Sequence, residues 1–92
     1  NGSFGAQLDR AFENLAVALS AAGSSTAEVV KLTIYVVEYG YEKAAFIQKA
    51  VGRYFGNARL PACSLIGVEA LARPEFLVEV EALAIGEGRG LS

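Results

Sequence analysis

Two glutamates near the end of the sequence have the type and spacing that acid–base chemistry requires. Glu79 and Glu81 are two residues apart in FLVEVEALAI, residues 76–85. In a strand, both carboxylates would point to one face, roughly 7 Å apart along the backbone. The other residues expected on that face are apolar: Leu77, Leu83 and Ile85. Partial desolvation there would suit a general acid or base, whereas the ordinary interpretation is a pair of solvent-facing or salt-bridged strand residues.

The single cysteine is a second candidate for chemistry. Cys63 closely follows Pro61 at the start of an expected strand, where a side chain can line a cleft. Because the sequence has no histidine, a nucleophilic thiol would need a helix N-terminus or a cation such as Arg59 or Arg73. The alternative interpretation is a buried, inert thiol. Spacing alone selects neither arginine as an anion-binding residue.

The composition excludes several classes of site and partner. With zero histidines and one cysteine, the chain lacks the usual zinc sites, histidine-based triads and internal disulfides. A net charge of −2 gives no basic excess for binding nucleic acid. The sequence shows no long apolar run and no signal-peptide pattern, so we expect a cytoplasmic protein that does not enter a membrane. No metal or organic cofactor is implied.

Hydrophobic periodicity predicts one domain over residues 1–92, with the element order α-β-α-β-β. The expected elements are a helix over 5–22, a strand over 29–39, a helix over 41–55, and strands over 61–71 and 76–85. Gly23 should end the first helix, since a left-handed cap costs glycine least. We expect the last two strands to pair as an antiparallel hairpin and the glycine-rich tail over 86–92 to be flexible.

The strand over 29–39 predicts how the layers pack. One of its faces is wholly apolar and consists of Val30, Leu32, Ile34 and Val36. The other face includes Lys31 and Thr33 but remains too hydrophobic for open water. Two helices can cover one face of such a thin α+β layer, and 53% of the residues are hydrophobic. We therefore expect the chain to assemble with other copies through the second face.

Five successive segments carry a resemblance to a known family. They are QLDRAFENLAVALSAAG, EVVKLTIYVVEY, FIQKAVGRYFG, LPACSLIGVEAL and LVEVEALAI. Over about residues 7–85, this succession resembles the Rid family, the reactive intermediate deaminases, also called YjgF-like proteins. The resemblance implies a chorismate-mutase-like α+β fold in a homotrimer, with the sheets in a central barrel and small-molecule clefts between subunits. It also implies that a β-hairpin, which usually precedes the first helix in the family, is missing from this chain.

The resemblance implies candidate site residues. The family's glutamate in a VEIE-like segment, which positions the hydrolytic water, matches Glu79. The arginine that binds the substrate carboxylate in a Pro-Ala-Arg motif is replaced by Cys63, so the chain is similar to an arginine-less branch. A ligand-contacting asparagine of the family aligns with Gln48.

Two functions follow as expectations. The first is hydrolytic deamination of small imine, enamine or related C=N metabolites in the clefts between subunits, with Glu79 as the catalytic residue. The second is a non-catalytic, small-molecule-binding or regulatory trimer that uses the same clefts. The family has also been labelled endoribonuclease, but the acidic charge and the lack of histidine argue against RNA cleavage.

Overall fold

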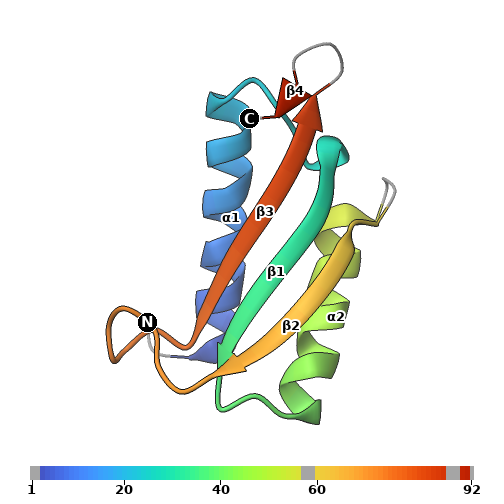
Figure 1. Cartoon of the computed structure of the whole chain (residues 1–92). Helices are drawn as coiled ribbons and strands as arrows, with labels where there is room; N and C mark the ends of the chain where they lie inside the picture. Colours follow the sequence, from blue (N-terminus) through green and yellow to red (C-terminus); the bar gives the residue numbers. More distant parts are fainter. Residues whose placement is uncertain (1–2, 57–59, 87–89, 92) are drawn as a thin grey trace.

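The computed structural model describes residues 3–56, 60–86 and 90–91. The elements in chain order (Figure 1) are α1 (Phe4–Ala21), the 3₁₀ turn η1 (Thr26–Glu28), β1 (Val29–Val37), α2 (Tyr41–Phe55), β2 (Ala62–Val68), β3 (Val78–Gly86) and β4 (Gly90–Leu91). The predicted order of two helices and three strands is confirmed. In the segment predicted to be a flexible tail, β4 pairs with Ile85 and Gly86. Residues 87–89 and 92 lie outside the described residues.

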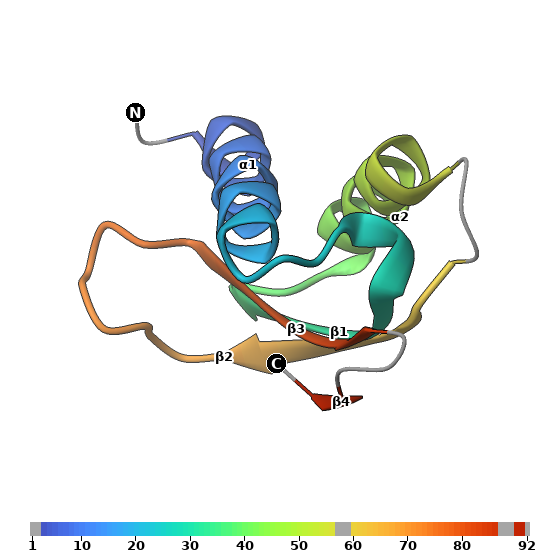
Figure 2. The same cartoon turned by 90° about the horizontal axis from the view of Figure 1, so that it is seen from above.

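Both α-helices lie on one face of the sheet, and no described helix covers the opposite face (Figure 2). The strand order is β2-β1-β3-β4, with β1 parallel to β2 and antiparallel to β3. The largest fully buried side chains come from both helices and β1: Phe12, Phe55, Leu8, Leu32, Ile34, Ile47, Val29 and Val36. The hydrophobic core therefore lies between the helices and one face of the sheet.

The predicted hairpin between the last two long strands is wrong, because β1 lies between β2 and β3. A β1–α2–β2 crossover of the usual right-handed kind places β2 parallel to β1 and keeps α2 on the sheet's helical face. The connection over residues 69–77 then has to pass the end of β1. It is long enough, since an extended residue spans about 3.3 Å and neighbouring strands lie about 4.8 Å apart.

Local capping groups define both ends of α1. The Ser3 side chain accepts a hydrogen bond of 3.1 Å from the backbone N–H three residues later. At the other end, Gly23 has φ +78°. The Gly23 N–H donates to the Ser20 carbonyl at 3.0 Å and the Ser24 N–H donates to the Leu19 carbonyl at 2.7 Å, which is a Schellman motif. The prediction that Gly23 ends this helix is confirmed.

The central strand β1 follows the predicted alternation except near its ends. Three of the four residues predicted for the core face are buried: Leu32, Ile34 and Val36. At the start, the register against β3 shifts between Val29 and Lys31, and Val29 rather than Val30 is buried. The predicted faces of these two valines are therefore wrong, since a bulge reverses the alternation. The strand stops at Val37 because Glu38 takes a left-handed φ of 55°.

Aromatic side chains join the two helices. Phe12 stacks on Tyr54 with ring centroids 4.8 Å apart, and it meets Phe55 edge to face at 6.2 Å. An Arg53–Asp9 ion pair of 3.1 Å links the same helices at the surface. An exposed ion pair contributes at most about 1 kcal/mol. Burial of Phe12 and Phe55 therefore provides most of the stabilisation between the helices.

We expect Phe12→Ala to lower the free energy of unfolding by about 3–5 kcal/mol, because it removes a buried ring and leaves a cavity. Urea denaturation at a fixed protein concentration measures the change. Val17→Ala on the same helix is the control, since Val17 is 69% exposed and its truncation should change stability by less than about 0.5 kcal/mol. Equal unfolding midpoints for the two variants would contradict the packing of α1 on α2.

Candidate functional site

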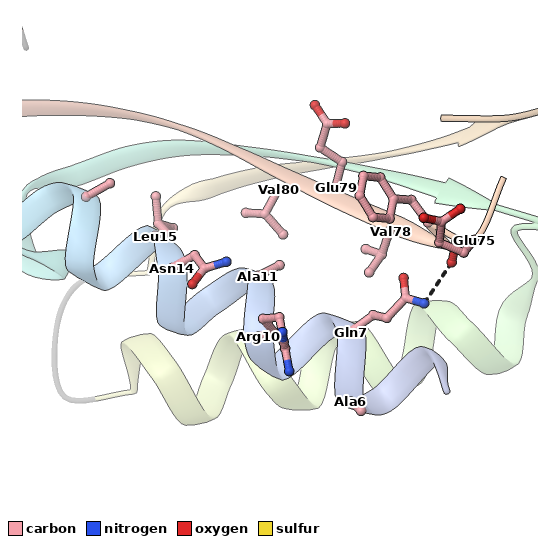
Figure 3. Close-up of a pocket in the computed structure, with 12 residues that line it drawn as sticks. Ala6, Gln7, Arg10, Ala11, Asn14, Leu15, Glu75, Val78, Glu79 and Val80 are labelled. Carbon is pink, nitrogen blue, oxygen red and sulfur yellow. Dashed lines mark hydrogen bonds between the residues drawn. The ribbon is translucent and has the colours of Figure 1, made fainter. Parts of the chain in front are cut away.

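The uncovered face of the sheet carries both glutamates. Side chains alternate along β3, and Figure 3 shows Glu79 on the far side of the strand from α1, whereas Val78 and Val80 point toward α1. Glu81 is two residues from Glu79 and shares its face, so that prediction is confirmed. Both glutamates are exposed, so the apolar neighbours do not bury these carboxylates within a single chain.

Tyr35 of β1 gives the two glutamates different environments. Tyr35 is the register partner of Glu79, but its hydroxyl donates to Glu81 Oε1 at 3.1 Å. This hydrogen bond is the main cause that raises the pKa of Tyr35, with smaller effects from desolvation and from the charges of Glu81 and Glu79. Tyr35 is therefore a protonated donor at neutral pH. Within the described residues, no hydrogen bond or ion pair holds the Glu79 carboxylate, which is free to contact a water molecule or ligand.

The other two predicted ligand residues lie apart from Glu79. Cys63 pairs with Leu32 in the parallel register of β1 and β2. Since Leu32 is buried beneath the helices, Cys63 points to the helical face, at the edge of the sheet. Glu79 points to the opposite face, and β1 separates the two strands. Gln48 is exposed on α2. A single chain therefore does not bring these three side chains into one pocket.

Among the residues that the structure describes, none activates the thiol of Cys63. The alternative prediction of a buried cysteine is wrong, because Cys63 is exposed. Even so, partial desolvation raises the pKa of the Cys63 thiol and keeps it mostly neutral at neutral pH. Of the two candidate cations, Arg73 donates to Glu75 Oε2 at 2.9 Å, and Arg59 lies outside the described residues. The hydrogen bond from Arg73 holds the pKa of Glu75 below its usual range.

A groove of about 740 Å³ runs between α1 and β3 (Figure 3). Val78, Val80 and Leu15 contribute apolar surface to it. Its polar side chains on α1 are Gln7, Arg10 and Asn14. Hydrophobic periodicity places these three residues on the solvent side of the helix, so the sequence did not indicate that they line a groove. Their spacing of three and then four residues, one stripe along a helix, was the available signal.

Gln7 connects α1 to the start of β3. Its side-chain Nε2 donates to the Glu75 carbonyl at 2.9 Å, and its Oε1 accepts from the Leu77 N–H at 2.8 Å. These bonds satisfy two backbone groups of the 69–77 connection and hold the entry to β3 against α1. They also help to position Glu79, which follows Leu77 by two residues. No local sequence pattern predicts a contact between residues so far apart in the chain.

The described residues contain neither a metal-ligand cluster nor a membrane-spanning helix. No group of three or more Asp, Glu or Cys side chains among them is arranged to hold a metal ion. Neither α-helix of this part of the chain is long and apolar enough to cross a bilayer. The polar side chains that the described residues gather on the uncovered face beside Glu79 are the carboxylate of Glu81 and the phenol of Tyr35.

Comparison with known proteins shows strong similarity over most of the chain. Protein DfrA of Myxococcus xanthus is 37% identical over 84 residues, which are 91% of this chain and 61% of DfrA. The crystal structure of YyfB from Yersinia pestis, described as a Rid-family protein of unknown function, is 40% identical with a TM-score of 0.86. That match covers 90% of this chain and 62% of YyfB, so the chain spans less than two thirds of both relatives.

A second solved structure and a family model agree with these relatives. Rv2704 of Mycobacterium tuberculosis, described as a member of the YjgF/YER057c/UK114 family, is 33% identical with a TM-score of 0.78. That match covers 89% of this chain and 67% of Rv2704. The model of the family described as Endoribonuclease L-PSP matches residues 1–86. With two helices packed on one face of a mixed sheet, the chain belongs to this family, the Rid or YjgF family, and has its chorismate-mutase-like fold.

Proposed function

We propose that the protein hydrolyses a small imine, enamine or related C=N compound in clefts between copies of the chain, with Glu79 as the catalytic residue. The observation that carries the proposal is the Glu79 carboxylate, which no described side chain holds, on a sheet face that no described helix covers. Family membership supports a family-level role toward small molecules, and the match of Glu79 to the family's glutamate is what the resemblance implies.

The chemistry that Glu79 would perform is the addition of water to a C=N bond. The carboxylate accepts a proton from water while the water oxygen bonds to the imine carbon, and Glu79 then passes that proton to the imine nitrogen. In the resulting carbinolamine, the hydroxyl proton moves through Glu79 to the nitrogen as the C–N bond breaks, so that ammonia leaves and a carbonyl forms. An enamine enters the same sequence after proton transfer to carbon gives the imine. Glu79 begins and ends the reaction as a carboxylate.

A complete cleft requires more than one chain under this proposal. Glu79 and Cys63 point to opposite faces of the sheet, so a ligand that contacts both takes them from two copies. The uncovered face includes three exposed apolar side chains, from Ile66, Leu83 and Ile85. Their burial in a homotrimer would remove apolar surface from water and complete the cleft at the same time.

A second candidate function is small-molecule binding without turnover. The observation that favours it is the neutral thiol of Cys63, where the family resemblance implies a carboxylate-binding arginine. Loss of a bidentate, charge-assisted contact weakens the binding of a carboxylate ligand by about 2–4 kcal/mol. A protein with this substitution can keep its clefts for another ligand. We do not extend the proposal to RNA, since the net charge of −2 does not favour a phosphate backbone.

We expect Glu79→Gln to reduce imine hydrolysis by about a hundredfold or more, because the amide cannot accept the proton from water. The assay follows ammonia release from 2-iminopropionate and from a carboxylate-free imine. Glu81→Gln is the matched control, since it changes a carboxylate on the same strand face and should retain activity. Turnover by Glu79→Gln at the parent rate would contradict the role of Glu79. Saturable ligand binding without product in the parent protein would favour the second candidate function.

We expect the protein to sediment at three times the mass of one chain and Ile66→Asp to shift it toward the single-chain mass. Ile66 is 40% exposed on the uncovered face of a single chain. An aspartate carboxylate at this position would lose its hydration when the face is buried in the assembly, which is costly. Val17→Asp, on the outer side of α1, is the control and should leave the assembly intact. Analytical ultracentrifugation measures both variants. If Ile66→Asp leaves the assembly unchanged, this face is not the interface.

We expect Cys63 to react with iodoacetamide more slowly at pH 7.5 than an ordinary cysteine. A raised pKa lowers the thiolate fraction at a given pH. The alkylation rate should therefore rise with pH, with a midpoint above the pKa of an ordinary cysteine thiol. Mass spectrometry of the alkylated protein measures the rate, and urea-unfolded protein is the control that should regain the ordinary midpoint. A midpoint below the ordinary value would instead indicate an activated, nucleophilic thiol.

A further inference from the structure

The phenol of Tyr35 lies beside Glu79, on the central strand β1. Tyr35 is opposite Glu79 in the antiparallel register and opposite Ile66 in the parallel register. Both neighbouring strands of β1 belong to the described residues, so the neighbours of Tyr35 within the sheet do not depend on what pairs with the outer edges of β2 or β3. The hydrogen bond to Glu81 is the main cause that raises the pKa of Tyr35, and the charge of Glu79 adds a smaller effect. Glu79 is therefore near the same hydroxyl.

Hydrogen bonding leaves the oxygen of Tyr35 as an acceptor. A phenol has one hydrogen to donate and oxygen lone pairs that accept. The hydroxyl of Tyr35 donates its hydrogen to Glu81 Oε1 at 3.1 Å. Within the described residues, no group donates to the Tyr35 oxygen in return. An ionised carboxylate such as Glu79 is also an acceptor only. A ligand that bridges Glu79 and the Tyr35 oxygen must therefore supply the donors.

The charge beside Tyr35 is negative, because Glu79 and Glu81 are its neighbours on β3. Lys31 is on the same face of β1, but it is four residues from Tyr35, which is about 14 Å along a strand. The arginines among the described residues lie elsewhere: Arg10 lines the groove beside α1, and Arg53 and Arg73 pair with Asp9 and Glu75. The described surroundings of Glu79 thus favour a cation over a carboxylate.

Cys63 adds no positive charge to this site. It takes the position at which the family resemblance implies a carboxylate-binding arginine. Partial desolvation raises the pKa of its thiol, which is therefore mostly neutral at neutral pH. Ile66, beside Tyr35 on β2, adds an exposed apolar side chain. A small cation with N–H donors and an apolar part matches this combination of groups, whereas a carboxylate does not.

We propose that the Glu79 site selects protonated imines or amidines that carry N–H donors and no carboxylate, with the Tyr35 oxygen as the specificity-determining acceptor. The inference rests on the proposed function, since it names the ligand class of the same site. The ligand donates N–H groups to Glu79 and to Tyr35, and its apolar part packs on Ile66. Since a carboxylate has two oxygens, Glu79 can accept from the ligand and from water together.

Glu81 does not contact the ligand under this proposal. It holds the hydroxyl hydrogen of Tyr35, and a glutamine at position 81 would do the same through its own Oε1. A protonated imine has its positive charge on the nitrogen next to the carbon that water attacks. The group that binds to Tyr35 and Glu79 is therefore adjacent to the reacting atom.

Acetamidinium and acetate test the ligand class without turnover, because they have the same planar shape and opposite charge. We expect acetamidinium to shift the NMR signals of Tyr35 and Glu79 saturably, with a Kd lower than that of acetate by about tenfold or more. Tetramethylammonium, a cation without N–H groups, should also bind about tenfold more weakly than acetamidinium, since the Tyr35 oxygen requires a donor. A preference for acetate would overturn the proposal.

Tyr35→Phe separates the effect of the phenol oxygen from that of charge. This variant keeps the ring and removes the acceptor, so acetamidinium should bind about tenfold more weakly while tetramethylammonium binding is unchanged. Thr33→Val is the matched control, because Thr33 lies on the same face of β1, two residues away. It should retain acetamidinium binding. Equal affinity of the parent protein and Tyr35→Phe for acetamidinium would show that Tyr35 does not determine specificity.

Hydrolysis assays distinguish this inference from the proposed function. We expect kcat/KM for ammonia release to be about tenfold or more higher with 2-iminopropane, which has a methyl group in place of the carboxylate, than with 2-iminopropionate. If 2-iminopropionate is the better substrate, hydrolysis stands and the inferred ligand class is wrong. If acetamidinium binds as expected but neither imine is hydrolysed, the ligand class stands and the proposed hydrolysis is wrong.

Discussion

Both helices of the molecule pack on the same face of one sheet, and this one-sided packing determines where every candidate residue lies. The parallel β1–α2–β2 unit places α2 on this face, and α1 packs beside it over β3. Successive side chains along a strand point to opposite faces of the sheet. Val78 and Val80 face the core side, whereas Glu79 and Glu81 face the uncovered side. The acidic pair is exposed because its apolar neighbours along the strand must contact the helices.

The sequence was sufficient to predict the elements but not their order across the sheet. Periodicity and capping located both helices to within one residue, since α2 has a clear apolar stripe and Gly23 ends α1. The strand order depends on how a crossover returns to the sheet, which no local pattern records. For that reason the hairpin between β2 and β3 was wrongly predicted. The bulge at Val29 was also beyond prediction, because Val30 continues the alternation of Leu32 and Ile34 and nothing local marks the shift to Val29.

The candidate site shows the same division between local and long-range information. The shared face of Glu79 and Glu81 follows from their spacing alone, and the structure agrees. The separation of Glu79 from Cys63 does not follow from sequence spacing. It depends on the position of β1 between their two strands and on the face to which each side chain points. The contact made by Gln7 is the clearest feature that the sequence did not predict. Its two hydrogen bonds to the 69–77 connection bring together residues that are distant in sequence.

The uncovered face of the sheet carries apolar and polar side chains close together, and the two kinds have different chemical requirements. On the uncovered face, apolar side chains such as Ile66 and Leu83 favour burial by another sheet, and polar groups around Tyr35 would then be enclosed beside them. Glu79 lies on the same face, so a sheet that buried these apolar side chains would also enclose its carboxylate. Covering this face and holding a water molecule or ligand at Glu79 therefore depend on the same packing.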